Sequence, residues 1–315
     1  VVPEPWSLQQ AVTSWRLDLI WVLFAIITTW WYLAGVRRMV RRGDQWPISR
    51  TLNWIFAMAV LVYATGGGVA VYGEYLFSVH MIGHMLLTMM VPISIVLAAP
   101  VTLIMRAVQP RHDGSLGGRE WVLGIVHSRW VSIVGHPLIA TIVFALSLIV
   151  FYYSSLLSWA TTTHLGHEWM VVHFLVGGYL FIQALIGIDP TPHRTAYPVR
   201  FILLMGTMVF HAFFGLSLMM GESLLIPEWY GAMGRTWGDD PLTDQQVGGG
   251  IAWGVGEVPT LVLSAMVALS WVRSDSREQK RGDRKAQRDG DADLNDYNAM
   301  LERLAQRDAR TTTER

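Results

Sequence analysis

The sequence predicts an all-α integral membrane protein with seven transmembrane helices. Of its 315 residues, 52% are hydrophobic and only 15% are charged, which is not the composition of a soluble domain. Seven stretches are apolar over about 20 residues, the length that a helix needs to cross a bilayer. The formal net charge is zero and there is no basic excess, so we expect no nucleic-acid partner.

The predicted spans follow one another along the chain, at about 17–36, 52–72, 76–105, 136–158, 168–188, 201–220 and 251–272. Glycines 66–68 fall near the end of the second span, where they let a neighbouring helix approach closely or break the helix. Pro92 and Pro100 interrupt the third span, and we expect kinks there because each proline removes a backbone donor. The polar connection 109–130 is expected to be a loop, and a second long connection covers 222–250.

The membrane domain is predicted to be residues 1–272, followed by a charged tail, 273–315. We expect most of this tail to be disordered because it is rich in Asp, Arg and Lys. Five apolar residues recur at helical spacing near its end, which predicts a short amphipathic helix at about 293–305. They are Leu294, Tyr297, Met300, Leu301 and Leu304. The first residue is Val1 and no signal peptide follows it, so we expect a fragment of a longer chain.

Orientation follows from the basic residues, because Lys and Arg are retained on the cytoplasmic side of a membrane. The connections after the first, third, fifth and seventh spans carry most of them. These are Arg37, Arg38, Arg41 and Arg42; Arg111, Arg119 and Arg129; Arg194; and the start of the tail. The sequence therefore predicts an N-terminus outside the cell and a cytoplasmic C-terminus.

Six of the ten histidines then fall in the outer half of the membrane, on three different spans. They are His80 and His84 on the third span, His164, His167 and His173 on or just before the fifth, and His211 on the sixth. Residues four apart share a helix face, so His80 and His84 point to the same neighbour. Ionisable groups in hydrocarbon need a partner, which predicts a ligand-binding or proton-handling site. Glu257, on the seventh span, lies at a similar depth.

Copper is the metal that the donor set favours. The chain has no cysteine, so a thiolate site is excluded. Met81 and Met85 lie beside the two histidines of the third span, and imidazole with thioether favours Cu(I), whereas zinc more readily takes histidine with carboxylate. Most of the methionines are nevertheless expected to be packing residues. Neutral imidazole is the ligand, so loading should weaken on acidification.

Several short segments follow one another in a fixed order along the chain. They are His80-Met81-Ile82-Gly83-His84, His136-Pro137, His173-Phe174-Leu175, Gly187-Ile188-Asp189-Pro190, His211-Ala212-Phe213-Phe214-Gly215 and Asp244-Gln245-Gln246 with Trp253. In this order they resemble the CtaG-type cytochrome c oxidase assembly proteins of bacteria, the multi-span kind tied to caa-type oxidases. The resemblance covers about 15–271.

This resemblance implies a non-enzymatic assembly factor, or chaperone, for a haem-copper oxidase of the respiratory chain. It would reside in the bacterial plasma membrane, contact oxidase subunits and lipid, and bind copper transiently as Cu(I). The family's histidines fall on His80, His84, His173 and His211 in this sequence. His164 and His167 match a more variable region, and Glu257, Met81 and Met85 are additional candidates. The resemblance also suggests the C-terminal half of an actinobacterial fusion with a CopD-like copper-resistance domain.

Three alternatives remain open at the level of the sequence. One is a metal-free scaffold for oxidase assembly, in which the histidines only lock helices together. The second is a seven-helix zinc hydrolase, with three histidines on zinc and Glu257 activating water. The third is a haem protein with axial histidines on facing helices.

Overall fold

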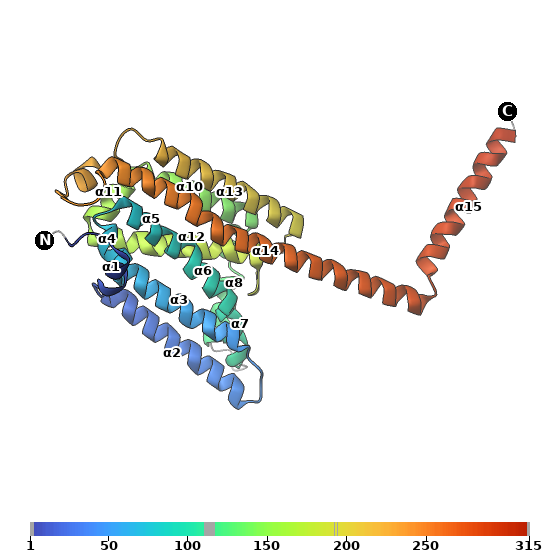
Figure 1. The fold of residues 1–315 in the computed structure, drawn as a ribbon. Coiled ribbons are helices and arrows are strands. Elements are labelled where there is room, and N and C mark those ends of the chain that lie inside the picture. Colours follow the sequence, from blue (N-terminus) through green and yellow to red (C-terminus); the bar gives the residue numbers. More distant parts are fainter. Residues whose placement is uncertain (1–2, 110–116, 192, 194, 314–315) are drawn as a thin grey trace. The chain divides into compact units, whose positions relative to one another are not determined.

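A computed structural model gives the fold of residues 3–109, 117–191, 193 and 195–313 (Figure 1). Every regular element in this described part is a helix, so the all-α prediction is confirmed. The chain divides into two units, Val1–Ala265 and Met266–Arg315, and each is described by itself.

Six helical stretches of the described chain are long and apolar enough to cross a membrane. They are α2 (Leu19–Arg41), α3 with α4 (Ile48–Gly73), the stretch Phe77–Ala107, α12 (His164–Ile186), α13 (Tyr197–Met219) and α14 (Pro241–Asp289). A seventh span is present if the bent pair α10 (Pro137–Tyr152) and α11 (Ser155–Thr162) is counted as one. The two helices of this pair meet at 72°, because Ser154 caps a new helix by accepting a hydrogen bond from the N–H of Leu156.

The third predicted span is built from four short segments in sequence. These are α5 (Phe77–Met85), a π-helical turn η1 (Leu86–Met90), α6 (Val91–Ala98) and α7 (Pro100–Ala107). The expected interruptions lie at the two prolines, each in the first turn of a new segment. Ala99, between α6 and α7, has a left-handed backbone with φ of 51°. The buried carboxylate of Asp189 closes the break by accepting hydrogen bonds from the N–H groups of Val101 (3.1 Å) and Thr102 (2.7 Å).

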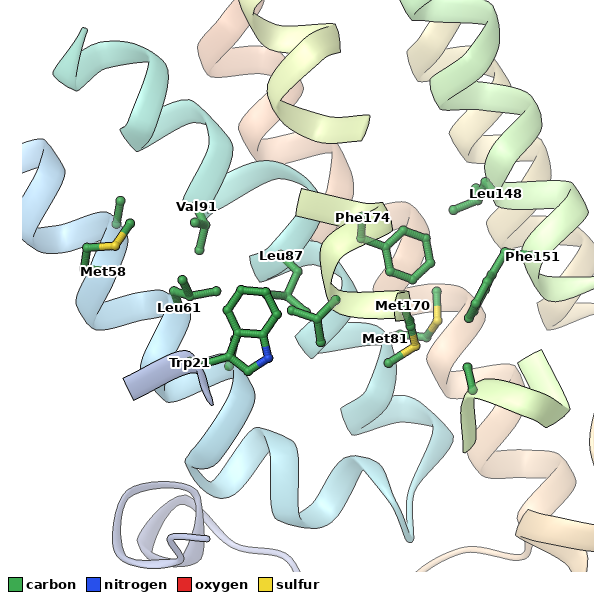
Figure 2. Packing of buried hydrophobic residues seen from close by; sticks show 14 of the residues in the cluster. Trp21, Met58, Leu61, Met81, Leu87, Val91, Leu148, Phe151, Met170 and Phe174 are labelled. Atoms are coloured by element: carbon green, nitrogen blue, oxygen red, sulfur yellow. The ribbon is translucent and has the colours of Figure 1, made fainter. Parts of the chain in front are cut away.

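The histidine-bearing span is the centre of the bundle. Its α6 segment packs against α3 on one side and α12 on the other. Figure 2 shows the apolar side chains that fill these contacts, with Leu61 and Met58 of α3 facing Val91, and Phe174 and Met170 of α12 near Met81. The side chains of the third span are therefore held from several directions.

The glycines of the second span do break its helix. α3 (Ile48–Gly66) ends there, and α4 (Gly68–Gly73) begins after Gly67. A Cβ on Gly68 would overlap the backbone of Ala11, so the glycine permits a close approach of the N-terminal segment.

That N-terminal segment carries a short helix that sequence patterns did not indicate, α1 (Leu8–Thr13). Aromatic side chains hold the segment through its backbone carbonyl groups. Tyr72 donates to the carbonyl of Glu4 (2.8 Å), Tyr63 to that of Ala11 (3.1 Å), and the Trp237 indole to that of Pro3 (2.8 Å). Residues 3–11 thus lie against the end of the bundle from which α2 and α5 start.

Two connections contain more helix than expected. Within the described part of 109–130, α8 (Gly118–Val126) and the start of α9 (Arg129–Val134) replace a loop. In the connection 222–250, a π-helical turn η2 (Pro227–Gly231) precedes α14, which begins ten residues before the predicted span. Residues 110–116 lie outside the described part.

The C-terminal tail, expected to be mostly disordered, is helical in the structure. α14 continues to Asp289, and α15 (Ala292–Thr313) is longer than the predicted helix at 293–305. Arg, Ala, Gln, Glu and Lys, which are good helix formers, make up about half of this stretch, so charge alone did not indicate its local structure.

Candidate functional site

A cavity of about 580 Å³ opens between the first residues of α2, the end of α3, α4, the first turns of α5, and the junction of α11 with α12. Four of the candidate histidines line it: His80, His84, His164 and His167. His164 is the most exposed of them, with 77% of its side chain accessible, and His84 is the least, at 3%. The cavity therefore runs from an exposed histidine to a buried one.

His84 is the most unusual polar group of this cavity. Neither ring nitrogen has a hydrogen-bond partner among the described residues, although both are buried. The ring contacts Phe174 edge to face, with centroids 4.3 Å apart, and Tyr152 at 5.6 Å. A buried polar group without a partner costs about 1–3 kcal/mol, so its retention calls for a ligand or another role.

His80 lies one turn before His84 and is held by a hydrogen bond. Its Nε2 lies 3.1 Å from the hydroxyl of the buried residue Tyr152. The ring also stacks on Phe77, with centroids 5.8 Å apart. The same tyrosine thus touches both histidines and sets the position of His80.

The backbone around His84 departs from regular α-helix immediately after it, at the π-helical turn η1. Thr88, within this turn, donates its hydroxyl hydrogen to the carbonyl of His84 at 2.7 Å. Gly178 of α12 packs directly on the turn, since a Cβ there would overlap the carbonyl oxygen of Thr88 and the ring of Pro92. π-helical turns inside α-helices occur frequently at functional sites, because they re-aim side chains.

The N-terminus of the histidine helix α5 is capped from a distant part of the chain. The buried carboxylate of Asp244, near the start of α14, accepts from the N–H of Phe77 at 2.6 Å and the hydroxyl of Ser78 at 2.5 Å. The next residue, Gln245, accepts from the N–H of Leu225 and donates to the carbonyl of Ser223. Sequence analysis singled out this Asp-Gln-Gln segment but gave it no role; its role is to fix α5 and the connection before α14.

Charged residues that sequence analysis did not select also line the cavity. Arg16 and Glu74 line it and form an ion pair of 2.7 Å, and the hydrogen bond to Glu74 raises the pKa of Arg16. Asp18 also lines it and caps α2 through the N–H of Ile20. Arg16 and Glu74 flank predicted spans on the predicted outer side, and Asp18 lies at the start of the first one. That position at the ends of spans was the available signal.

The other two principal candidates do not line this cavity. His173 of α12 stacks on Trp169, with centroids 4.8 Å apart, and lines a separate, small hollow that also reaches His84. His211 of α13 packs against Gly256 of α14, beside the sulfur of Met85. His84 itself lines both the large cavity and this small hollow. His84 is thus the central member of the predicted set.

The additional candidates have mainly packing contacts. Met81 is fully buried and adjoins Gly248, whose added Cβ would lie 3.3 Å from Cγ of Met81. The carboxylate of Glu257 accepts a hydrogen bond from the Trp253 indole at 2.6 Å. In the part of the chain that the structure describes, no three His, Cys, Asp or Glu side chains are grouped so that they could hold a metal ion.

Fold and site together define a multi-pass membrane protein with a histidine-lined cavity at one end of its helical bundle. The chain belongs to the family described as cytochrome c oxidase caa3 assembly factor (Caa3_CtaG), whose model matches residues 30–274. This family membership confirms the resemblance and a location in a bacterial membrane.

Two mycobacterial proteins are similar to nearly the whole chain. "Uncharacterized protein Mb0105" of Mycobacterium bovis is 40% identical over 306 residues, and "Uncharacterized protein ML1998" of Mycobacterium leprae is 39% identical over 306 residues. The alignments cover 96% of this chain and 46% of each relative, so the chain spans about half the length of the curated relatives it matches. No solved structure matches.

Proposed function

We propose that this protein binds Cu(I) at His84 in the cavity and passes it to a haem-copper oxidase during assembly of that enzyme. The observation that carries the proposal is the buried His84 imidazole, which has two ring nitrogens without partners and adjoins a cavity lined by further histidines. The family description supplies the link to oxidase assembly. In this proposal the protein carries metal and catalyses no reaction.

The donors around the cavity favour copper over zinc. They are imidazoles, the thioether of Met170 and the carboxylates of Asp18 and Glu74, with no thiolate anywhere in the sequence. The two carboxylates already have partners, since Glu74 pairs with Arg16 and Asp18 caps α2, which leaves imidazole and thioether as the available donors. Cu(I) accepts such soft donors and is stable with two ligands, whereas zinc sites use three or four protein ligands. A two-ligand site is compatible with the absence of a three-ligand group among the described residues, and it leaves the metal easy to release.

Binding requires a small movement of His84. Its nitrogens are buried, so the ring must turn toward the cavity before a metal can reach it. The π-helical turn that begins two residues after His84 supports such a movement, because the regular α-helical hydrogen bonding is already interrupted there. His80, one turn away, and His167, on α12, line the same cavity.

We also propose that the protein has seven spans, with the N-terminus outside and the C-terminus in the cytoplasm. The distribution of arginines in the connections supports this orientation. The cavity would then face the outer side of the membrane, and the recipient would be an oxidase subunit with a copper site on that side.

The test is an anaerobic Cu(I) titration of the purified chain against a chromophoric chelator. We expect about one Cu(I) per chain, and a loss of at least about tenfold in affinity for the variant His80→Ala, His84→Ala. The matched control is His136→Ala, His193→Ala, another pair of neighbouring histidines whose ring centroids lie 5.2 Å apart, outside the cavity. Equal binding by the two double variants would refute the copper proposal.

A further inference from the structure

Four arginines at the C-terminal end of α2 line a groove of about 510 Å³ together with Ala34. They are Arg37, Arg38, Arg41 and Arg42. At about 100° per residue they cover an arc of about 140° on the helix surface. Ala34 falls in the middle of that arc, one turn earlier, so its methyl group forms the floor between two rows of guanidinium groups.

The arginine arc faces away from the helical bundle. Tyr32 and Met39, on the opposite side of α2, are buried, and Gly35 packs against Leu103 of α7. All four arginines are exposed. The four side chains therefore point to the surroundings of the bundle and not into its interior.

None of the four arginines forms an ion pair within the described residues. The nearby carboxylate of Asp44 lies 3.8 Å from Arg106 instead. The negative end of the helix dipole favours cations here, but it amounts to about half a charge and cannot neutralise four guanidinium groups. The positive charge of the groove is therefore not neutralised by the described residues.

The same face of α2 is apolar in the preceding turns. Ile27, Trp30 and Trp31 lie below the arc at the same angular positions, with 53%, 62% and 66% of their surface exposed. From Ile27 to Arg41 the helix rises about 21 Å, close to the thickness of one membrane leaflet. Tryptophan favours the boundary between hydrocarbon and headgroups. The face thus has a cationic end and an apolar end. The distance between them matches that between the headgroup and the acyl chains of a phospholipid.

We propose that this face of α2 is a specific binding site for an anionic phospholipid. The arginine forks hold the phosphate, because guanidinium pairs with phosphate oxygens through two parallel hydrogen bonds. The acyl chains lie along Ile27 and Ala34 beside the two indoles. Arg37 with Arg41 and Arg38 with Arg42 form separate i, i+4 rows, so a lipid with two phosphates occupies the groove best. Basic groups beside a membrane helix are favourable partners for anionic headgroups.

The test is native mass spectrometry of the full chain, delipidated in detergent and titrated with lipids of matched acyl chains. We expect tighter binding of phosphatidylglycerol than of phosphatidylcholine, and the tightest binding of diphosphatidylglycerol. The variant Arg37→Gln, Arg41→Gln should bind the anionic lipids about thirtyfold more weakly. The control Arg277→Gln, Arg281→Gln makes the same charge change at exposed positions of α14, outside the groove, and should bind like the unchanged chain.

Two further arms separate a lipid site from a simple anion site. Ala34→Phe fills the groove floor without changing charge and should weaken lipid binding, while inorganic phosphate at millimolar concentration should not displace the lipid. Any of three results would overturn the proposal. They are equal affinity for phosphatidylglycerol and phosphatidylcholine, equal losses of lipid affinity in the two double arginine variants, and full displacement of the lipid by phosphate. Thermal denaturation of each variant identifies any that is unfolded, and for such a variant the single substitution Arg41→Gln is measured instead.

Discussion

Asp244 of α14 accepts a hydrogen bond of 2.6 Å from the backbone N–H of Phe77, the first residue of the histidine helix α5. The two residues are separated by 167 positions, so α5 is held in place by a part of the chain that is distant in sequence. Because His80 and His84 lie in the first two turns of α5, their positions depend on this carboxylate.

The substitution Asp244→Ala should therefore destabilise the protein and impair the site. Loss of a helix cap costs about 0.5–2 kcal/mol, and the N–H of Phe77 and the hydroxyl of Ser78 would be left buried without a partner. Thermal denaturation in detergent measures the loss, and Cu(I) titration should show weaker binding. Asp239→Ala, the same change at an exposed position five residues earlier, should change neither quantity.

Two adjacent glycines of α12 should respond oppositely to alanine. At Gly178 a Cβ would overlap the Thr88 carbonyl, so Gly178→Ala must displace the π-helical turn and should cost about 1–3 kcal/mol. At Gly177 nothing lies within 4 Å of the added Cβ, and Gly177→Ala should stabilise the helix by about 0.5–1 kcal/mol. Denaturation of both variants checks this; a similar loss at both positions would show that α12 does not pack on the turn as described.

His84→Leu should increase the stability of the metal-free protein. The change removes two unpartnered ring nitrogens from a buried site and keeps the volume close to that of histidine, which should gain about 1–3 kcal/mol. Melting curves in the presence of a Cu(I) chelator measure it. His80→Leu is the control and should not stabilise, because it removes the hydrogen bond with Tyr152. A lower melting temperature for His84→Leu would mean that the imidazole has a partner in solution.

Tyr152→Phe isolates the hydrogen bond that holds His80. The substitution should cost about 0.5–1.5 kcal/mol, since Nε2 of His80 loses its partner. In the copper proposal it also frees that nitrogen, so Cu(I) affinity should rise. The adjacent Tyr153→Phe removes an exposed hydroxyl paired with Ser217, which water can replace, and should have a smaller effect on stability and none on copper. Unchanged copper affinity in Tyr152→Phe would show that Nε2 of His80 takes no part in binding.

The cap of α14 should fray on acidification. The hydrogen bond from the Thr243 hydroxyl, followed by those from the backbone N–H groups of Thr243 and Leu242, lowers the pKa of Asp240 below its ordinary value of 3.8. A lowered carboxyl pKa contributes stability that is present above pH 3.8 and is lost as the pH falls through the folded-state value. NMR titration of the Asp240 carboxyl should give a midpoint below 3.8. In Asp240→Asn this pH dependence should vanish.

Apolar length, the positions of proline and glycine, and helical spacing predicted most of the helical architecture. They located the six long spans, the breaks at Gly67 and Pro100, and the shared placement of His80 and His84. The bend after Tyr152 was not predicted, because Ser154 starts a new helix by a local hydrogen bond inside an apolar run.

Long-range partners could not be read from periodicity. The caps that Asp244 and Asp189 provide join segments 167 and 88 residues apart, and a single sequence carries no signal for such pairing. Similarly, the predicted depth in the membrane grouped His173 and His211 with His84. It could not show that only His84 of these three lines the large cavity. The direction in which each ring points depends on neighbouring helices, here Trp169 for His173 and Gly256 for His211.

The way in which the N-terminal segment is fastened has a consequence for its tolerance of change. Tyr63, Tyr72 and Trp237 bind the main-chain oxygens of Ala11, Glu4 and Pro3, and every amino acid offers the same oxygen. Substitutions at those three acceptor positions therefore leave the three hydrogen bonds possible, whereas replacement of an aromatic donor removes one of them. Within the segment, the tolerance should be lowest at Trp6 and Trp15, whose rings pack on Tyr72 and Tyr63.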